Sequence, residues 1–153
     1  MGWIEIKDAN DIKHLLDYFG NFHDGCFREI HLWNSYFVTD ELSMCCGDNS
    51  LNGNVLFQRQ YEKPSAIEIC FNEIQSIHVN SPRAGIWQSI FGVTLLYNDG
   101  VFYFADEENW DTNNPEFNGS VWIIAKRIRW RDTSEWMGDK LRYGYHEIKR
   151  PAP

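Results

Sequence analysis

Long apolar runs and export signals are both missing from this sequence. No stretch approaches the roughly 18 apolar residues that a membrane-spanning helix needs. The opening segment Met1-Gly2-Trp3-Ile4-Glu5-Ile6 has neither the basic region nor the apolar core of a signal peptide. The first absence argues against a membrane protein and the second against secretion. We therefore expect a cytoplasmic chain with no membrane partner.

The motifs that mark common enzymes and metal proteins are absent as well. The four cysteines form no Cys-x-x-Cys pair and have no histidine at a zinc-site spacing; they are Cys26, Cys45, Cys46 and Cys70. No Gly-x-Ser-x-Gly nucleophile motif occurs. We therefore expect reduced thiols, two of them buried, with no metal, no cofactor and no nameable catalytic residue.

Internal repeats, linkers and low-complexity segments are also lacking, which argues against a second domain. The 153 residues are 43% hydrophobic and 24% charged, a composition typical of a globular rather than a disordered protein. A chain of this length can bury one core. We predict a single domain over residues 1–148, followed by a disordered tail over residues 149–153.

Positive charge is in deficit. The chain has 14 lysines and arginines against 22 aspartates and glutamates, which gives a formal net charge of -8. This field repels a phosphate backbone, so nucleic-acid binding is disfavoured, and it attracts a cationic protein surface. Aromatic residues make up 16% of the chain, and both sheets and protein interfaces favour them. We therefore expect a protein partner with a basic surface, and the composition does not define the oligomeric state.

One helix is predicted near the start of the chain. Asp8 or Asn10 can cap its first turn, and Gly20 can end it. Its apolar residues recur at helical spacing, at Ile12, Leu15, Leu16 and Phe19. One stripe of this helix is therefore expected to be buried.

From Cys26 onward, apolar and polar residues alternate with the period of two that predicts β-strands. Two strands flank Asn98-Asp99-Gly100, which suits a tight antiparallel hairpin. Residues 47–54 are rich in turn formers and predict a loop or wide hairpin, whereas residues 36–46 are ambiguous. We predict an α+β domain: a mainly antiparallel curved sheet or partly closed barrel, with one N-terminal helix packed against it.

Strict alternation also predicts how the last strand, residues 120–131, divides its side chains between two faces. One face would carry Trp122, Ile124, Ile128 and Trp130, and the other Val121, Ile123, Ala125, Arg127, Arg129 and Arg131. Because opposite charges on neighbouring strands support each other, we expect the three arginines to pair with Asp106-Glu107-Glu108.

The segment Phe22-His23-Asp24-Gly25 joins the predicted helix to the first long strand. A histidine beside an aspartate in a loop suits a general base or a metal ligand, but these residues can equally shape a turn. A hydrolase or metal-dependent enzyme would need His23 and Asp24 to converge with Asp106 or His78 in a pocket. We favour a non-enzymatic role and take His23 and Asp24 as candidate binding residues.

The densest acidic cluster follows the predicted hairpin and includes an aromatic side chain. It does not have the spacing of a calcium-binding loop. Carboxylates steer association with a basic surface, and tryptophan is a frequent interface anchor. We therefore take four further residues as candidate contacts: Asp106, Glu107, Glu108 and Trp110.

Several features together resemble a known group of proteins. They are Phe22-His23-Asp24 after an N-terminal helix, a strand with Ile30 and Leu32, the stretch IEICFNEIQSIHV, and the closing strand VWIIAKRIRWR. In these features the chain is similar to small bacterial domains, some of which are grouped with the immunity proteins of polymorphic toxin systems. Gly25 departs from the serine or alanine expected there.

This resemblance implies a non-enzymatic protein that binds and blocks a toxin domain made by the same or a neighbouring cell. It carries over no catalytic residue. Besides this hypothesis and the enzyme centred on His23 and Asp24, a third remains, in which a small barrel holds an apolar ligand between its aromatic strands.

Overall fold

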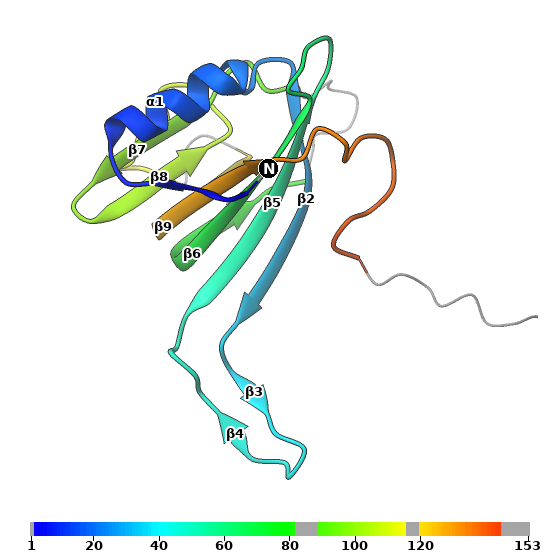
Figure 1. The fold of residues 1–153 in the computed structure, drawn as a ribbon. Coiled ribbons are helices and arrows are strands. Elements are labelled where there is room, and N and C mark those ends of the chain that lie inside the picture. Colours follow the sequence, from blue (N-terminus) through cyan, green and yellow to red (C-terminus); the bar gives the residue numbers. More distant parts are fainter. Residues whose placement is uncertain (1, 82–88, 116–119, 145–153) are drawn as a thin grey trace, which may run out of the picture.

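The fold is an open, antiparallel sheet with one helix, seen in a computed structural model that describes residues 2–81, 89–115 and 120–144. The elements in chain order are β1 (Ile4–Ile6), α1 (Ala9–Tyr18), the 3-10 helix η1 (Gly20–Phe22), β2 (Gly25–Asn34), β3 (Phe37–Val38), β4 (Met44–Cys45), β5 (Leu51–Arg59), β6 (Ala66–Val79), β7 (Thr94–Asn98), β8 (Val101–Ala105) and β9 (Val121–Asp132) (Figure 1). The predicted α+β class is confirmed. Part of the predicted domain, residues 145–148, and the predicted tail, residues 149–153, lie outside the described residues.

The main sheet has seven strands in the order β2-β5-β6-β9-β8-β7, and β1 pairs with β9. Every pair in it is antiparallel. In the part of the chain that the structure describes, β2 and β7 end the sheet without pairing with each other, so it is not closed into a barrel. An isolated bridge between Gly25 and Ile90 links β2 to the segment that precedes β7. A closed barrel, which the apolar-ligand hypothesis requires, is not the fold observed.

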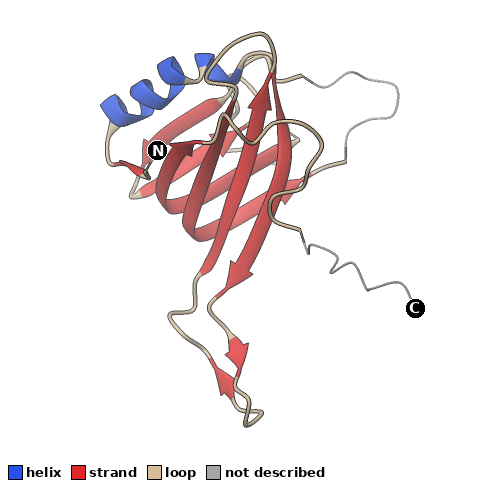
Figure 2. Ribbon diagram, turned by 45° about the vertical axis from the view of Figure 1, so that its right-hand side comes forward, coloured by secondary structure: helices blue, strands red, loops and turns tan. Residues whose placement is uncertain are grey.

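Helix α1 covers one face of the sheet, as predicted (Figure 2). Asp8 caps it: its carboxylate oxygen accepts hydrogen bonds from the backbone N–H groups of Asn10 and Asp11, at 2.8 and 3.1 Å. The buried stripe includes Ile12 and Leu15. Rings from the helix end and from the strands fill the space beneath, among them Phe19, Phe22, Phe57, Phe71, Phe104 and Trp130.

The predicted hairpin is confirmed as β7 and β8, with Asn98 paired to Val101. Its two turn residues, Asp99 and Gly100, have φ angles of 50° and 81°. Positive φ at both central positions is the geometry of the tightest hairpin turns, which aspartate and glycine tolerate.

The two central strands do not keep a strict period of two, so the predicted division of the last strand between two faces is wrong. Ile123 and Ala125 lie in the main core together with Ile128 and Trp130. Trp122 lies in a second cluster with Ala105 and Trp110. The alternation therefore shifts by one residue between Ala125 and Ile128, next to the register shift between Ile74 and Ser76 of β6, and we call this irregular place the bend.

Strand β6 breaks its alternation at the same level. Its core residues Phe71 and Ile74 are three positions apart, and Asn72 is opposite Arg127 of β9. Between them, Glu73 has a φ of 51°. This left-handed conformation is costly for a residue with a side chain. The Glu73 carboxylate lies 3.4 Å from Lys126 Nζ and 3.2 Å from Arg127 Nε, so two ion pairs span the bend.

The chain after β9 covers part of the other face of the sheet. Glu68, which is almost fully buried there, accepts hydrogen bonds from Arg131 Nε at 2.6 Å and from the Tyr143 hydroxyl at 2.8 Å. Burial, reinforced by the Glu68 carboxylate, raises the pKa of Tyr143. Arg131 and Arg127 thus pair with Glu68 and Glu73, and the predicted pairing of these arginines with Asp106-Glu107-Glu108 is wrong.

All four cysteines are free thiols, but only Cys70 is buried; Cys26 and Cys46 are exposed and Cys45 is intermediate. The expectation of two buried thiols is therefore wrong. Among the described residues, no helix is long and apolar enough to cross a membrane.

Candidate functional site

Residues 35–50 form a projection that we call the arm. It leaves the sheet at the end of β2 and returns at the start of β5 (Figure 1). Within it, β3 and β4 form a two-stranded sheet of their own, in which Phe37 is opposite Cys45 and Val38 is opposite Met44. An isolated hairpin of this size has little stability by itself. Its position therefore depends on how its base is held.

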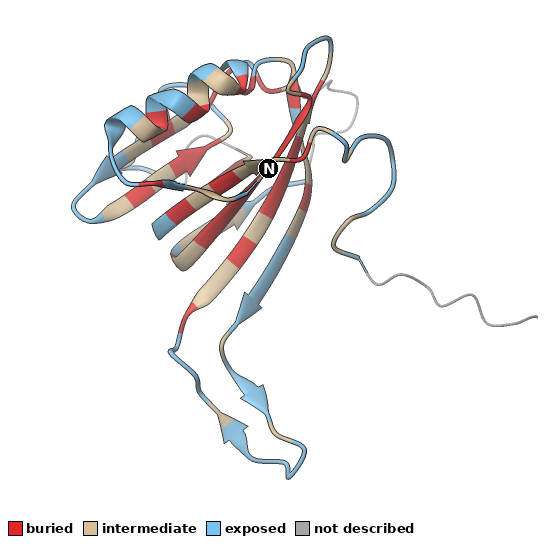
Figure 3. Cartoon of the chain, in the orientation of Figure 1, coloured by how far each residue is buried: buried red, intermediate tan, exposed pale blue. Residues whose placement is uncertain are grey.

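Large apolar side chains of the arm point into solvent. Leu42 at the tip is 86% exposed, Met44 is 66% exposed and Phe37 is 56% exposed. Tyr36 and Val38 are exposed too. Figure 3 shows the contrast, because the arm is almost entirely exposed whereas the neighbouring strands carry buried bands. Scattered exposed apolar residues are ordinary, but a contiguous group of them marks an interaction surface.

Both faces of the arm are apolar. Neighbouring residues of a strand point to opposite faces. The Phe37 and Cys45 pair therefore lies on one face, and the Val38 and Met44 pair on the other. A two-stranded hairpin can bury at most one of its two faces against its own domain. In the arm neither face is buried.

The charges of the arm all have one sign. Asp40, Glu41 and Asp48 are acidic, and residues 35–50 include no lysine or arginine. Asp40 and Glu41 belong to the turn that joins β3 to β4, which places them beside Leu42. The tip therefore presents apolar groups and carboxylates together.

The base of the arm is fixed by hydrogen bonds around Ser35. Its backbone N–H donates to Ser50 O at 3.0 Å, and its hydroxyl accepts from the Ser50 backbone N–H at 3.0 Å. Gly47 lies against the same residue at a φ of 51°, and a Cβ at this position would come 2.6 Å from Ser35 O. Only glycine fits this close approach without displacement.

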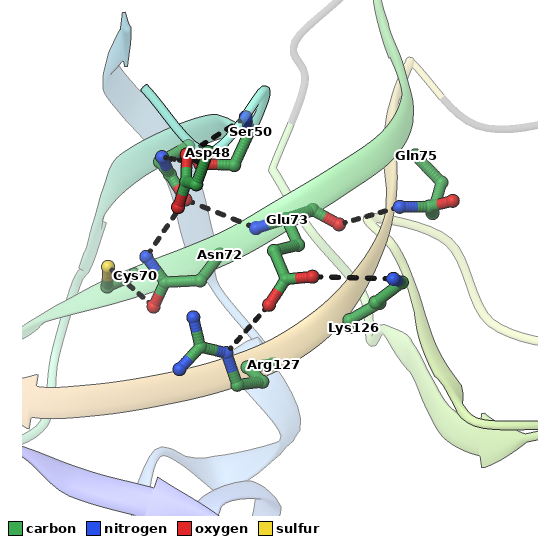
Figure 4. Close-up of polar contacts among 9 residues, drawn as sticks. Asp48, Ser50, Cys70, Asn72, Glu73, Gln75, Lys126 and Arg127 are labelled. Carbon is green, nitrogen blue, oxygen red and sulfur yellow. Dashed lines mark hydrogen bonds and ion pairs between the residues drawn. The ribbon is translucent and has the colours of Figure 1, made fainter. Parts of the chain in front are cut away.

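A chain of hydrogen bonds continues from this base into the sheet (Figure 4). Asp48 Oδ1 accepts from the Ser50 hydroxyl at 2.6 Å, and Ser50 Oγ accepts from Asn52 Nδ2 at 3.0 Å. Asn52 Oδ1 then accepts from Asn72 Nδ2 at 3.2 Å and from the Glu73 backbone N–H at 3.1 Å. The hydrogen bonds from Ser50 and Ser35 lower the pKa of the Asp48 carboxyl. The arm is thereby tied to the bend at Glu73.

The predicted residues His23 and Asp24 lie at the opposite end of β2 from the arm. His23 Nε2 is 3.7 Å from Asp24 Oδ2, and His23 Nδ1 is 2.8 Å from Phe91 O. Both side chains are partly exposed. No hydrogen bond or ion pair within the described ranges joins either of them to Asp106 or His78, so the arrangement that the enzyme hypothesis requires is not observed.

Two of the predicted acidic contacts have structural roles. Asp106 accepts hydrogen bonds from the Ser120 hydroxyl at 2.7 Å and from the Val121 N–H at 3.1 Å, which fixes the start of β9. Glu108 Oε1 accepts from Asn21 Nδ2 at 3.4 Å, so the acidic segment lies beside η1. Its exposed members, Glu107 and Glu108, remain accessible to a partner.

Trp110 is buried, whereas a residue that anchors a partner would be exposed. Its ring is 4% exposed and stacks on Trp122 at a centroid distance of 5.7 Å, and its Nε1 donates to Pro115 O at 3.1 Å. Trp110 thus holds the loop onto the sheet in this structure.

Among residues 2–81, 89–115 and 120–144, no three His, Cys, Asp or Glu side chains gather in a way that could hold a metal ion. The arm is therefore the candidate site with the clearest geometry. No family model, curated protein or solved structure was found to match the chain.

Proposed function

We propose that this chain is a non-enzymatic protein-binding domain that engages its partner with the arm. The observation that carries this proposal is the solvent exposure of apolar side chains on both faces of the arm, with Leu42 exposed at its tip. Such groups gain free energy when a partner removes them from water, at about 25 cal/mol per Å² of apolar surface. A projecting hairpin suits insertion into a cleft better than contact with a flat surface.

The charge of the arm favours a partner of a particular kind. Three carboxylates and no cation lie in residues 35–50 of a chain whose net charge is -8. A cleft with an apolar floor and a basic rim complements this combination. Complementary charge speeds association and makes it sensitive to salt, whereas buried apolar anchors slow dissociation.

The resemblance to immunity proteins supplies a candidate for such a partner. A toxin that acts on nucleic acid needs a basic active-site cleft, because its substrate is polyanionic. An acidic, apolar arm placed in that cleft would exclude the substrate. We therefore propose a bacterial toxin domain as the partner, made by the same or a neighbouring cell, and a cytoplasmic site of action.

The test uses a purified toxin domain encoded beside the gene. Isothermal titration calorimetry measures binding, and a toxin activity assay measures inhibition. The triple variant F37S/L42S/M44S removes the apolar groups of the arm, and Tyr97→Ser is the matched control because it removes an exposed ring from the β7–β8 hairpin. We expect the triple variant to weaken binding at least a hundredfold, as the loss of two or three interface anchors would.

The outcomes separate the two parts of the proposal. A toxin that the wild-type protein neither binds nor inhibits removes the immunity function. A toxin that the wild-type protein and the triple variant bind equally well leaves the function in place but removes the arm as its docking surface.

A further inference from the structure

A buried arginine lies at the end of β5 that is remote from the arm. Arg59 is the last residue of this strand, and the arm joins its first residue, Leu51. The Arg59 side chain is only 5% exposed. Its guanidinium lies over the Phe19 ring, 4.9 Å from the centroid, and its Nε donates to Pro64 O at 2.7 Å.

The rest of this guanidinium has no strong acceptor. A guanidinium carries five N–H donors, and the Nε bond to Pro64 O uses one of them. Among the residues that the structure describes, neither Nη1 nor Nη2 has a hydrogen bond. The nearest carboxylate oxygen, Glu62 Oε2, lies 3.9 Å from Nη1 on a side chain that is 75% exposed. Neither Nη atom belongs to the fully buried polar atoms that lack a partner, so both reach solvent, and an acceptor on a ligand can replace water there.

Arg59 lines a pocket of about 230 Å³. Its lining comes from the helix end and from the turn after β5, and includes Gly20, His23, Asp24, Arg59, Gln60 and Glu62. Tyr61, which is 85% exposed, lines the pocket too. The His23 and Asp24 pair singled out in the sequence thus belongs to this pocket.

The backbone around the pocket is shaped to accommodate the arginine. Gly20 has a φ of 54°, and a Cβ there would come 2.3 Å from Arg59 Nη1. Phe22, Asp24 and Tyr61 also have positive φ angles, of 62°, 59° and 70°. Left-handed residues with side chains are costly and collect at binding sites more often than elsewhere.

The chemistry of the lining defines the ligand. A guanidinium binds a carboxylate or a phosphate through two parallel hydrogen bonds. The Asp24 and Glu62 carboxylates line the same pocket, so a ligand with several negative charges would be repelled. A ligand that carries both a negative and a positive group can pair with the guanidinium and with the two carboxylates.

We propose that the pocket binds a small zwitterion of the α-amino-acid type. Arg59 binds the carboxylate of the ligand, and Asp24 and Glu62 receive its ammonium group. The Tyr61 ring lies beside the cation, as aromatic rings do in many sites for ammonium ligands. This site does not depend on the arm or on the identity of a protein partner.

Isothermal titration calorimetry of the whole chain tests the proposal with a panel of free L-amino acids, acetate, methylamine and inorganic phosphate. We expect at least one amino acid to bind at millimolar concentration or below, and more tightly than acetate, methylamine or phosphate. Failure of every amino acid to bind, or tighter binding of phosphate, overturns the proposal.

Two variants locate the site. Arg59→Lys keeps the charge but loses the paired hydrogen bonds, so we expect binding of the amino acid to weaken roughly tenfold or more. Glu62→Gln removes an exposed carboxylate and leaves the buried arginine in place. It should weaken binding of the amino acid roughly two- to fivefold and strengthen binding of acetate, because one repulsive charge is lost.

Glu135→Gln is the matched control, since it makes the same change at an exposed position outside the pocket and should alter neither affinity. If Glu62→Gln strengthens amino-acid and acetate binding alike, the ligand is a simple anion and the zwitterion proposal is wrong. If Arg59→Lys folds with the melting temperature of the wild type and binds the amino acid unchanged, the site lies elsewhere.

Discussion

The sheet and the arm are built from similar apolar residues and place them in opposite environments. Phe57, Phe104 and Trp130 are fully buried between the sheet and α1. Phe37, Leu42 and Met44 of the arm are exposed. Hydrophobic residues stabilise a fold only where they are removed from water. The apolar groups of the arm therefore add little to the stability of the domain and are available for binding.

The two regions are also held in place differently. Packing of rings on both sides of the strands holds the sheet. Hydrogen bonds at its base hold the arm, through Ser35, Ser50 and Asn52. Substitutions in the sheet should therefore change global stability, and substitutions in the arm should change local order or binding.

The largest effect on stability is expected from Phe57→Ala. Phe57 is fully buried, and its ring contacts Phe22 and Phe104 at centroid distances of 5.1 and 5.5 Å. Loss of the ring leaves a cavity in the middle of the core. We expect the free energy of unfolding to fall by about 3–5 kcal/mol, measured by urea denaturation. A loss below about 1 kcal/mol would show that the core beneath α1 is not the stabilising centre.

The next effect concerns Tyr143, whose hydroxyl donates to the buried Glu68 carboxylate at 2.8 Å. Tyr143→Phe removes a hydrogen bond to a charged group, which is worth about 1.5–3 kcal/mol. Because burial raises the pKa of Tyr143 in the folded state, the folded chain keeps a proton that the unfolded chain loses above about pH 10. The stability of the wild type should therefore fall as the pH rises above this value.

Urea denaturation between pH 8 and about pH 11 checks this dependence. The Tyr143→Phe curve should be flatter than that of the wild type. A residual slope remains, because the hydrogen bond to Asp132 raises the pKa of Tyr18 to about 12. The arm supplies the control: Tyr36→Phe should leave the slope unchanged. Equal slopes for Tyr143→Phe and the wild type would contradict the link between Tyr143 and Glu68.

The sequence predicts the sheet well because alternation and turn chemistry act locally. Asp99 and Gly100 identify their hairpin, and Asp8, one of the two caps that the sequence allows, begins α1. It fails at the bend, because the left-handed Glu73 and the shifted alternation after Ala125 belong to a register shift between two strands that are distant in the chain. A period of two cannot indicate where one residue is inserted.

The candidate site was harder to predict for a related reason. Residues 36–46 are ambiguous in the sequence because both faces of β3 and β4 carry apolar groups. The signal that was present is the pair of short apolar runs around Asp40 and Glu41, without any cation nearby. The burial of Arg59 is not predictable from the sequence, because it depends on Gly20 and Phe19, which are distant in the chain.

A smaller and local effect is expected at the base of the arm from Gly47→Ala. The new Cβ would come 2.6 Å from Ser35 O, and φ is already 51°. We expect the amides of residues 35–50 to lose about 1–3 kcal/mol of protection in hydrogen exchange while the amides of the sheet keep theirs. Gly100→Ala is the matched control, because its φ is 81° and nothing lies within 4 Å of the new Cβ. Equal losses of arm protection in both variants would show that the contact with Ser35 does not fix the arm.

The smallest effect on stability, and the sharpest contrast with Phe57→Ala, is expected from the triple variant F37S/L42S/M44S. These side chains are 56%, 86% and 66% exposed, so most of their apolar surface is already in water in the folded state. Surface substitutions of this kind usually change stability by less than about 0.5 kcal/mol each. Urea denaturation should therefore give nearly the wild-type free energy of unfolding, whereas binding to the proposed partner should be lost. A destabilisation close to that of Phe57→Ala would mean that the arm is packed against the domain in solution, and its apolar groups would then be unavailable to a partner.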